Sequence, residues 1–186
     1  PHWEKYAPGL KTITDALKIR ENILISFEKA ERLKKMKEVQ AYLNFVIVGG
    51  GPTGVEMAGA IAEIAHKTLF KNFKKISPEK SKIYLIEGFD RVLPGFPKKL
   101  SDYAGKTLKK MGVTVMTSQM VSDITEQGVQ VGNLFLESHN VIWAAGNEGS
   151  PLLKTLNTPL DKQGRAMVEK DLSLPKHPEI FVIGDT

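Results

Sequence analysis

The chain has 186 residues, of which 41% are hydrophobic and 25% charged, so its composition is that of a globular domain and not of a disordered chain. The formal net charge is +5, but the lysines are scattered over helical segments without interleaved aromatic residues, which argues against a nucleic-acid-binding protein. No cysteine is present and no apolar run approaches the ~20 residues that span a bilayer, which excludes disulfides, thiol chemistry and a transmembrane helix.

The first predicted element is a long amphipathic helix, which follows the loop at residues 6–9 and ends near Lys37. Its apolar side chains recur at helical spacing and share one stripe: Ile13, Leu17, Leu24 and Phe27. The next run, residues 44–48, is short, continuously apolar and followed by three glycines. That pattern is typical of a strand buried on both faces of a parallel sheet.

A second helix is expected directly after these glycines, because small and apolar side chains follow at helical spacing: Val55, Ala58, Ile61, Ala62 and Ala65. A buried run at residues 82–87 then completes a strand, helix, strand unit. Residues 100–111 indicate a further helix, which Gly112 ends, and residues 113–116 indicate a short strand.

The pattern changes at residues 119–137, where short alternating runs are broken by turn residues. This stretch predicts an antiparallel meander inserted in the α/β unit. Two apolar strands follow, at residues 141–146 and 180–185. The predicted fold class is therefore α/β: a Rossmann-like parallel sheet with an inserted antiparallel β-meander, preceded by a long N-terminal helix.

The turn at residues 49–54 carries the strongest functional signal, because it forms G-x-G-x-x-G between a strand and a helix. Its first glycine permits the tight turn, its second lets backbone approach a pyrophosphate, and its third allows close helix packing. The N–H groups of the helix N-terminus would then face the phosphates. We predict that a dinucleotide binds at Gly49, Gly50, Gly51, Pro52, Thr53 and Gly54. The alternative is a glycine-rich turn with no ligand.

Glu87 ends the second strand and is the candidate for the adenosine ribose, because a carboxylate can accept hydrogen bonds from both hydroxyls. The same carboxylate would repel a 2′-phosphate, so NAD is preferred over NADP. Arg91 lies nearby and weakens that preference, because an arginine beside the ribose suits NADP. The alternative is that Glu87 is a solvated acid at a strand end.

Three further residues are candidates for the cofactor site. Glu56 is expected in the first turn of the helix after the glycines, where the helix dipole favours an acid without further function. The alternative is that Glu56 faces the nicotinamide end of the cofactor. Ala145 and Gly146 are small enough for a dinucleotide to lie across the sheet edge, although small residues at strand ends are also common in loops.

The sequence indicates no catalytic nucleophile, acid–base pair or metal site. The four histidines do not stand with a carboxylate or hydroxyl at a spacing typical of a triad or a metal site: His2, His66, His139 and His177. Each is expected to be a surface or hydrogen-bonded residue. Trp143 is expected to pack in the core rather than to stack on a ligand. Any redox role of this chain must therefore use a cofactor.

Four motifs together resemble the two-dinucleotide-binding flavoprotein oxidoreductases: FVIVGGGPTGVE at residues 45–56, EGFDRVLP at 87–94, WAAG at 143–146 and IFVIGD at 180–185. Within that family the chain most resembles the type II NADH dehydrogenases, which are single-subunit NADH:quinone oxidoreductases. The leading stretch WEKYAPGLKT at residues 3–12 is also similar to that subfamily. The resemblance spans nearly the whole chain.

The resemblance implies a domain organisation in which an NAD domain is inserted between two halves of an FAD domain. Residues 1–43 would be a helical linker from the FAD domain, 44–150 the NAD(H)-binding Rossmann domain, and 151–186 a return segment. Both ends would then be cut from a longer protein. It also implies that Gly49, Gly51 and Gly54 hold the pyrophosphate and Glu87 the ribose, with Glu56 and Gly146 near the nicotinamide. Asp185 matches a Gly-Asp pair that touches FAD in the family.

The function expected from this resemblance is the NAD(H)-binding part of a flavin-dependent NADH dehydrogenase that passes electrons to a quinone. The fragment alone is expected to be inactive. The parent would be cytoplasmic, peripheral on the inner face of the cytoplasmic membrane, and dimeric. Another flavoprotein reductase of the family and a non-catalytic nucleotide-sensing module are alternatives. The absence of a Cys-x-x-Cys pair argues against a thioredoxin reductase.

Overall fold

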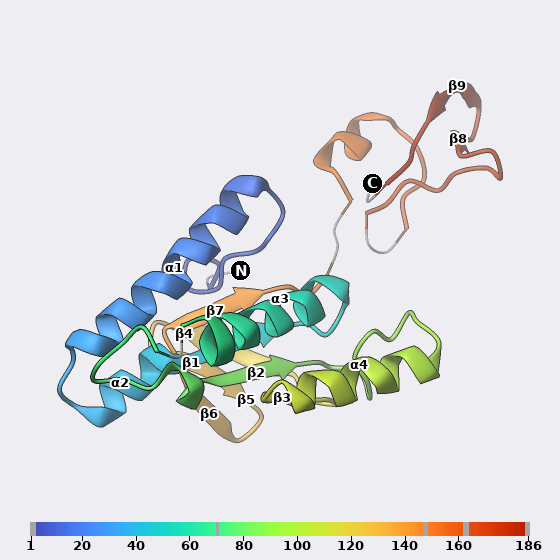
Figure 1. Ribbon diagram of the computed structural model, residues 1–186. Helices are drawn as coiled ribbons and strands as arrows, with labels where there is room; N and C mark the ends of the chain where they lie inside the picture. Colours follow the sequence, from blue (N-terminus) through green and yellow to red (C-terminus); the bar gives the residue numbers. More distant parts are fainter. Residues whose placement is uncertain (1–2, 70, 147–148, 162–163, 185–186) are drawn as a thin grey trace. The chain divides into compact units, whose positions relative to one another are not determined.

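A computed structural model describes the chain except residues 1–2, 70, 147–148, 162–163 and 185–186 (Figure 1). The chain divides into two compact units, Pro1–Ala145 and Gly146–Thr186. The assignment of residues 1–43 and 151–186 to a linker and a return segment of an FAD domain stays a prediction. Among the described residues, none of the helices combines the length and the apolarity needed to cross a bilayer.

The first unit is built on a four-stranded parallel sheet in the order β3-β2-β1-β7. The strands are β1 (Asn44–Val48), β2 (Lys82–Ile86), β3 (Val113–Met116) and β7 (Asn140–Trp143). β1 lies inside the sheet and is buried along its whole length, as its continuous apolar run predicts. β7 is shorter than predicted and ends at Trp143, which is half-buried and packs beside Trp3 with ring centroids 5.9 Å apart.

Side chains alternate between the two faces of this sheet and build two separate cores. On one face, Phe45, Ile47, Ile83 and Leu85 pack against the helices. On the other face, Val46, Val48 and Ile86 pack against the antiparallel meander. The meander consists of β4 (Val121–Thr125), β5 (Gly128–Val131) and β6 (Leu134–Glu137), which confirms the predicted insertion (Figure 1).

The N-terminal region forms two helices, α1 (Ile13–Arg32) and α2 (Met36–Leu43), so the prediction of one helix to Lys37 was wrong. Leu33 takes an extended conformation and its N–H bonds back to Ala30, which ends α1. The predicted apolar stripe is also not the buried face. Phe27 is fully buried, but Ile13 is 82% and Leu17 58% exposed. The packed face carries Ile19, Ile23, Ser26, Phe27 and Ala30.

Two further helices flank the sheet, α3 (Pro52–Glu63) and α4 (Lys98–Lys110). A π-helical turn, Ile64–Thr68, extends α3, and a short 3₁₀ turn, Pro78–Lys80, precedes β2. Gly112 follows α4 with φ 88°, as expected of a residue that ends a helix in the left-handed conformation. The predicted strand, helix, strand unit is thereby confirmed as a Rossmann-like arrangement.

The second unit has a 3₁₀ helix, Pro151–Thr155, and a two-stranded antiparallel sheet of β8 (Ser173–Leu174) and β9 (His177–Phe181). The strand predicted at residues 180–185 therefore begins and ends earlier, at His177 and Phe181. It pairs with its immediate neighbour β8 in a hairpin. Asp185 lies outside the described residues.

Glu31, in the last turn of α1, anchors the segment before β2. Its carboxylate accepts four hydrogen bonds of 3.0–3.1 Å from the backbone N–H groups of Lys74, Lys75 and Ile76. Loss of hydration raises the pKa of Glu31, the N–H donors lower it, and the net result is a pKa below the ordinary 4.5. The carboxylate thus supplies the acceptors that this turn of backbone lacks.

We expect Glu31→Gln to lower the melting temperature, because one of the two accepting oxygens becomes an amide group that repels the N–H donors. Since the folded-state pKa is depressed, this stabilisation is present at neutral pH and is lost as the pH falls through the folded pKa. The difference in melting temperature from the parent should therefore shrink below pH 4.5. Glu28→Gln, on the exposed side of the same helix, is the control. Equal melting of both variants at neutral pH would contradict the role.

Candidate functional site

The glycine turn joins β1 to α3 at the carboxyl edge of the parallel sheet, where ligands bind in open α/β folds. Gly49 has φ 109°, and a Cβ there would lie 2.6 Å from the backbone nitrogen of Ala145. A Cβ on Gly54 would overlap the carbonyl oxygen of Gly49. Only glycine at these two positions allows the strand to turn and the helix to begin directly beneath it.

Gly51 differs from its neighbours because its surroundings are open. A Cβ on Gly51 would meet no atom within 4 Å. Gly51 is the N-cap of α3, and Pro52 occupies the first helical position, where its missing N–H costs nothing. The N–H groups of Thr53 and Gly54 lie in the first turn, which has no intrahelical acceptors for them. Open space, free donors and the positive end of the helix dipole together suit a phosphate group.

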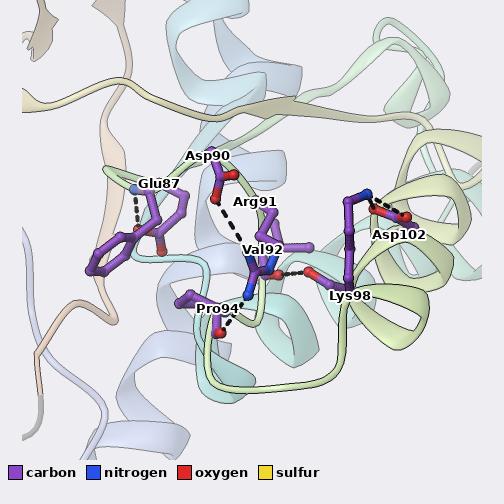
Figure 2. A network of polar contacts seen from close by, with 9 residues as sticks. Glu87, Asp90, Arg91, Val92, Pro94, Lys98 and Asp102 are labelled. Atoms are coloured by element: carbon purple, nitrogen blue, oxygen red, sulfur yellow. Dashed lines mark hydrogen bonds and ion pairs between the residues drawn. The ribbon is translucent and has the colours of Figure 1, made fainter.

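Glu87 lies immediately after β2, and its carboxylate is hydrogen-bonded to the glycine turn. Figure 2 shows its side chain beside the loop that carries Asp90 to Pro94. Its Oε2 atom accepts a 2.5 Å hydrogen bond from the N–H of Gly50, and its Oε1 atom accepts a 2.9 Å bond from the N–H of Phe89. The residue is 8% exposed. Two backbone donors therefore fix the carboxylate, and the remaining lone pairs of each oxygen are available to ligand hydroxyls. The alternative of a solvated strand-end acid does not fit this burial.

The loop at residues 88–97 is also hydrogen-bonded to the glycine turn. The N–H of Leu93 donates to the carbonyl of Gly50 at 2.7 Å, so both backbone groups of Gly50 are engaged. The hydroxyl of Ser101 on α4 donates to the carbonyl of Val92 and ties the loop to that helix. Leu93 and Phe89 were not predicted as site residues, because backbone hydrogen bonds leave no residue-type signal.

Arg91 is directed into its own loop (Figure 2). Its Nη2 donates to the carbonyl of Pro94 at 3.0 Å, and its Nη1 lies 3.6 Å from the carboxylate of Asp90. The charge of Arg91 also affects Asp102 on α4. The pKa of the Asp102 carboxyl is lowered chiefly by the hydrogen bond from Lys98, and the charges of Lys98, Lys106 and Arg91 lower it further. The guanidinium of Arg91 thus contacts groups of its own loop, whereas the Glu87 carboxylate is hydrogen-bonded to the glycine turn.

Of the other predicted site residues, Glu56 and Ala145 lie in the first unit and Gly146 in the second. Glu56 is exposed and is the fifth residue of α3, so its expected position in the first turn was wrong, because the helix begins at Pro52. Ala145 lies against Gly49. Gly146 has φ 78° and belongs to the second unit. Asp185 falls outside the described residues, so its expected contact with FAD stays a prediction.

The histidines that the structure describes make local contacts. His66 lies between the carbonyls of Met111 and Ser81, at 3.0 and 3.2 Å from its two ring nitrogens. His139 and His177 are exposed, and His2 lies outside the described residues. Over the described part of the chain, no three His, Asp or Glu side chains gather as metal ligands would. The site is therefore a set of backbone donors and one fixed carboxylate, suited to binding and orienting a dinucleotide.

The family model of pyridine nucleotide-disulphide oxidoreductases matches residues 6–186. The type II NADH:quinone oxidoreductase Ndh of Mycobacterium tuberculosis is 40% identical, over 99% of this chain and 42% of that protein. The external alternative NADH-ubiquinone oxidoreductase of Yarrowia lipolytica mitochondria is 31% identical, over 100% of this chain and 34% of that protein. The chain thus spans about two fifths or less of the length of these curated relatives.

A solved structure of NDH2 from Plasmodium falciparum in complex with NADH is also similar, with a TM-score of 0.83 and 30% identity. The similarity covers 98% of this chain and 40% of that one. It extends over both the parallel sheet and the inserted meander, and it agrees with the predicted fold class. The match to the family model over nearly the whole chain shows that this chain belongs to the pyridine nucleotide-disulphide oxidoreductase family.

Proposed function

We propose that this chain is the NAD(H)-binding portion of a flavin-dependent NADH dehydrogenase, which passes hydride from NADH to FAD and electrons on to a quinone. The observation that carries the proposal is the Glu87 carboxylate, buried and bonded to the glycine turn at Gly50. This geometry supports a role for the carboxylate as acceptor for ribose hydroxyls, beside backbone donors that suit a pyrophosphate. The names of the Mycobacterium and Yarrowia relatives support the quinone as acceptor.

In this proposal the residues of the chain bind and orient the cofactor. The N–H groups of Thr53 and Gly54 hold the pyrophosphate at the start of α3, where Gly51 leaves room for it. Glu87 accepts from the adenosine ribose and disfavours a 2′-phosphate. Ala145 and Gly146 leave space for the chain of the dinucleotide, and Glu56 and Gly146 lie towards its nicotinamide end. A bound flavin supplies the hydride acceptor, so no acid–base group is needed from this chain.

For the longer protein we further propose FAD as the flavin, with Asp185 contacting it. We also propose a peripheral position on the inner face of the cytoplasmic membrane. These assignments rest on the family relationship and on the Gly-Asp pair at residues 184–185.

We expect the isolated chain to bind NADH more tightly than NADPH and to oxidise neither. The preference follows from repulsion between the Glu87 carboxylate and a 2′-phosphate, and the inactivity from the proposal that this chain is only the NAD(H)-binding portion of the enzyme. Isothermal titration calorimetry with each nucleotide measures the preference, and absorbance at the nicotinamide band measures turnover. Equal binding of both nucleotides, or NADH oxidation by purified chain with bound flavin, would overturn the proposal.

A further inference from the structure

A cavity lies at the opposite end of the sheet from the glycine turn. It has a volume of about 420 Å³ and opens beside the first residues of β7, at the level of Asn140. Asn140 pairs with Phe45 at the amino end of β1, whereas the glycine turn follows the carboxyl end at Val48. The cavity is enclosed by α1, by residues 4–8 and by the β4–β5 turn at residues 125–126. It shares no residue with the proposed dinucleotide site.

One face of α1 gives the cavity its charge. Lys18, Asn22, Ile25 and Lys29 follow one another at steps of four, three and four residues, which aligns them on one side of the helix. Lys5 contributes a third ammonium group from the opposite wall. In the described part of the chain, none of these three lysines forms an ion pair with a carboxylate.

Two of the three ammonium groups lie over aromatic rings. A hydrogen bond with the Tyr6 side chain, and then the charge of Glu126, also raise the pKa of Lys5. Lys5 Nζ lies 4.6 Å from the ring centroid of Tyr6, and Lys29 Nζ lies 5.6 Å from that of Tyr42. Tyr42 in turn stacks on His139 with ring centroids 4.4 Å apart. An ammonium on a ring face is held more weakly than one that donates to a phosphate or carboxylate, so both lysines can be recruited by an anion.

The floor of the cavity is fixed by hydrogen bonds within the protein. Ser26 donates to Asn140 Oδ1 at 2.5 Å, and Asn140 Nδ2 donates to the carbonyl of Tyr42 at 2.8 Å. Ser138 donates to the carbonyl of Asn44 at 2.7 Å. These buried groups are satisfied without a ligand, so the cavity is preformed. The lysines and the Asn22 amide at its walls are left to contact a bound molecule.

We propose that this cavity binds a small organic anion of the class of an aromatic phosphate monoester. The lysines supply the charge, and two carboxylates at the cavity, Glu4 and Glu126, leave a net positive lining. An anion that draws Lys5 and Lys29 off the rings of Tyr6 and Tyr42 would uncover ring faces for an aromatic group. Apolar side chains complete the walls: Pro8, Ile19 and Ile23. A cavity of about 420 Å³ is within the range that accommodates small-molecule ligands.

Titration calorimetry of the whole chain with phenyl phosphate tests the proposal. We expect saturable binding that is tighter than binding of inorganic phosphate, because only the ester reaches the aromatic walls. The double variant Lys18→Gln/Lys29→Gln should lose about tenfold or more in affinity, since two of the three ammonium charges at the cavity are removed. Both lysines are exposed, so circular dichroism of this variant should match that of the parent.

Two controls separate this site from the rest of the molecule. Lys106→Gln/Lys110→Gln, on α4, removes the same charge away from the cavity and should leave the affinity unchanged. Glu87→Gln alters the dinucleotide site and should also leave phenyl phosphate binding unchanged. No binding, equal binding of phosphate and phenyl phosphate, or an equal loss in the α4 variant would overturn the proposal. Tighter binding in Glu87→Gln, which removes a carboxylate that repels phosphate, would place the anion at the glycine turn and overturn it as well.

Discussion

Glu87→Gln is expected to weaken NADH binding by roughly 10- to 100-fold and to reduce the preference for NADH over NADPH. A hydrogen bond to a charged group contributes about 1.5–3 kcal/mol, and each 1.4 kcal/mol is a factor of ten in affinity. Glutamine keeps one oxygen that can accept from the N–H of Gly50, so the glycine turn should keep its shape. Dissociation constants for both nucleotides, measured by titration calorimetry, give the effect.

Glutamine at position 87 is a better test of the ribose contact than arginine, because Glu87 is buried. Arginine at position 87 would leave the N–H groups of Gly50 and Phe89 without their acceptor, so lost binding could reflect a damaged loop. Glu79→Gln, an exposed acid before β2, serves as the matched control and should bind NADH like the parent. An unchanged NADH affinity in Glu87→Gln would remove this residue from the ribose site.

Gly54→Ala is expected to destabilise the first unit by roughly 3 kcal/mol and to abolish NADH binding. The added Cβ would overlap the carbonyl oxygen of Gly49, so α3 must move away from β1, and such overpacking costs typically 1–3 kcal/mol, occasionally more. Urea denaturation followed by circular dichroism measures the loss of stability. A variant as stable as the parent would show that the helix does not pack as closely as described.

Gly51→Ser separates binding from folding at the same turn. Gly51 has φ −70° and open surroundings, and serine is a preferred N-cap, so the free energy of unfolding should be kept or slightly raised. The new side chain would occupy the space proposed for the pyrophosphate, so NADH affinity should fall. A stable Gly51→Ser variant that binds NADH like the parent would refute the pyrophosphate position.

The sequence was sufficient where local patterns and packing agree. The run at residues 44–48 is apolar at every position and became the fully buried strand β1. Alternation broken by turn residues located the meander, and the glycine spacing located the turn between β1 and α3. Glu87 could be selected because it ends the second strand of the unit, where a carboxylate can accept from both ribose hydroxyls, although its spacing from the glycines is longer than usual.

The spacing of apolar residues did not predict which face of α1 is buried or where α1 ends. The residues Ile13, Leu17 and Leu24 share a stripe of α1, yet the helix packs through Ile19, Ile23 and Phe27. Both sets are apolar, and only the position of the sheet decides which is covered. The end of α1 at Arg32 and the start of α2 at Met36 were missed for a similar reason. No proline or glycine marks this break, and Leu33 turns the chain there.

By itself, the sequence determined the strand, helix, strand unit around the glycine turn, the position of that turn and the acid that ends the second strand. These depend on residue type and spacing along a few neighbouring positions. The tertiary structure alone decided which face of α1 is buried and where the cavity beside Asn140 forms. It also decided the hydrogen bonds of Glu31 to residues 74–76 and that of Leu93 to the carbonyl of Gly50. These join residues far apart in the chain, often through backbone groups that every residue carries, so no pattern of side chains records them.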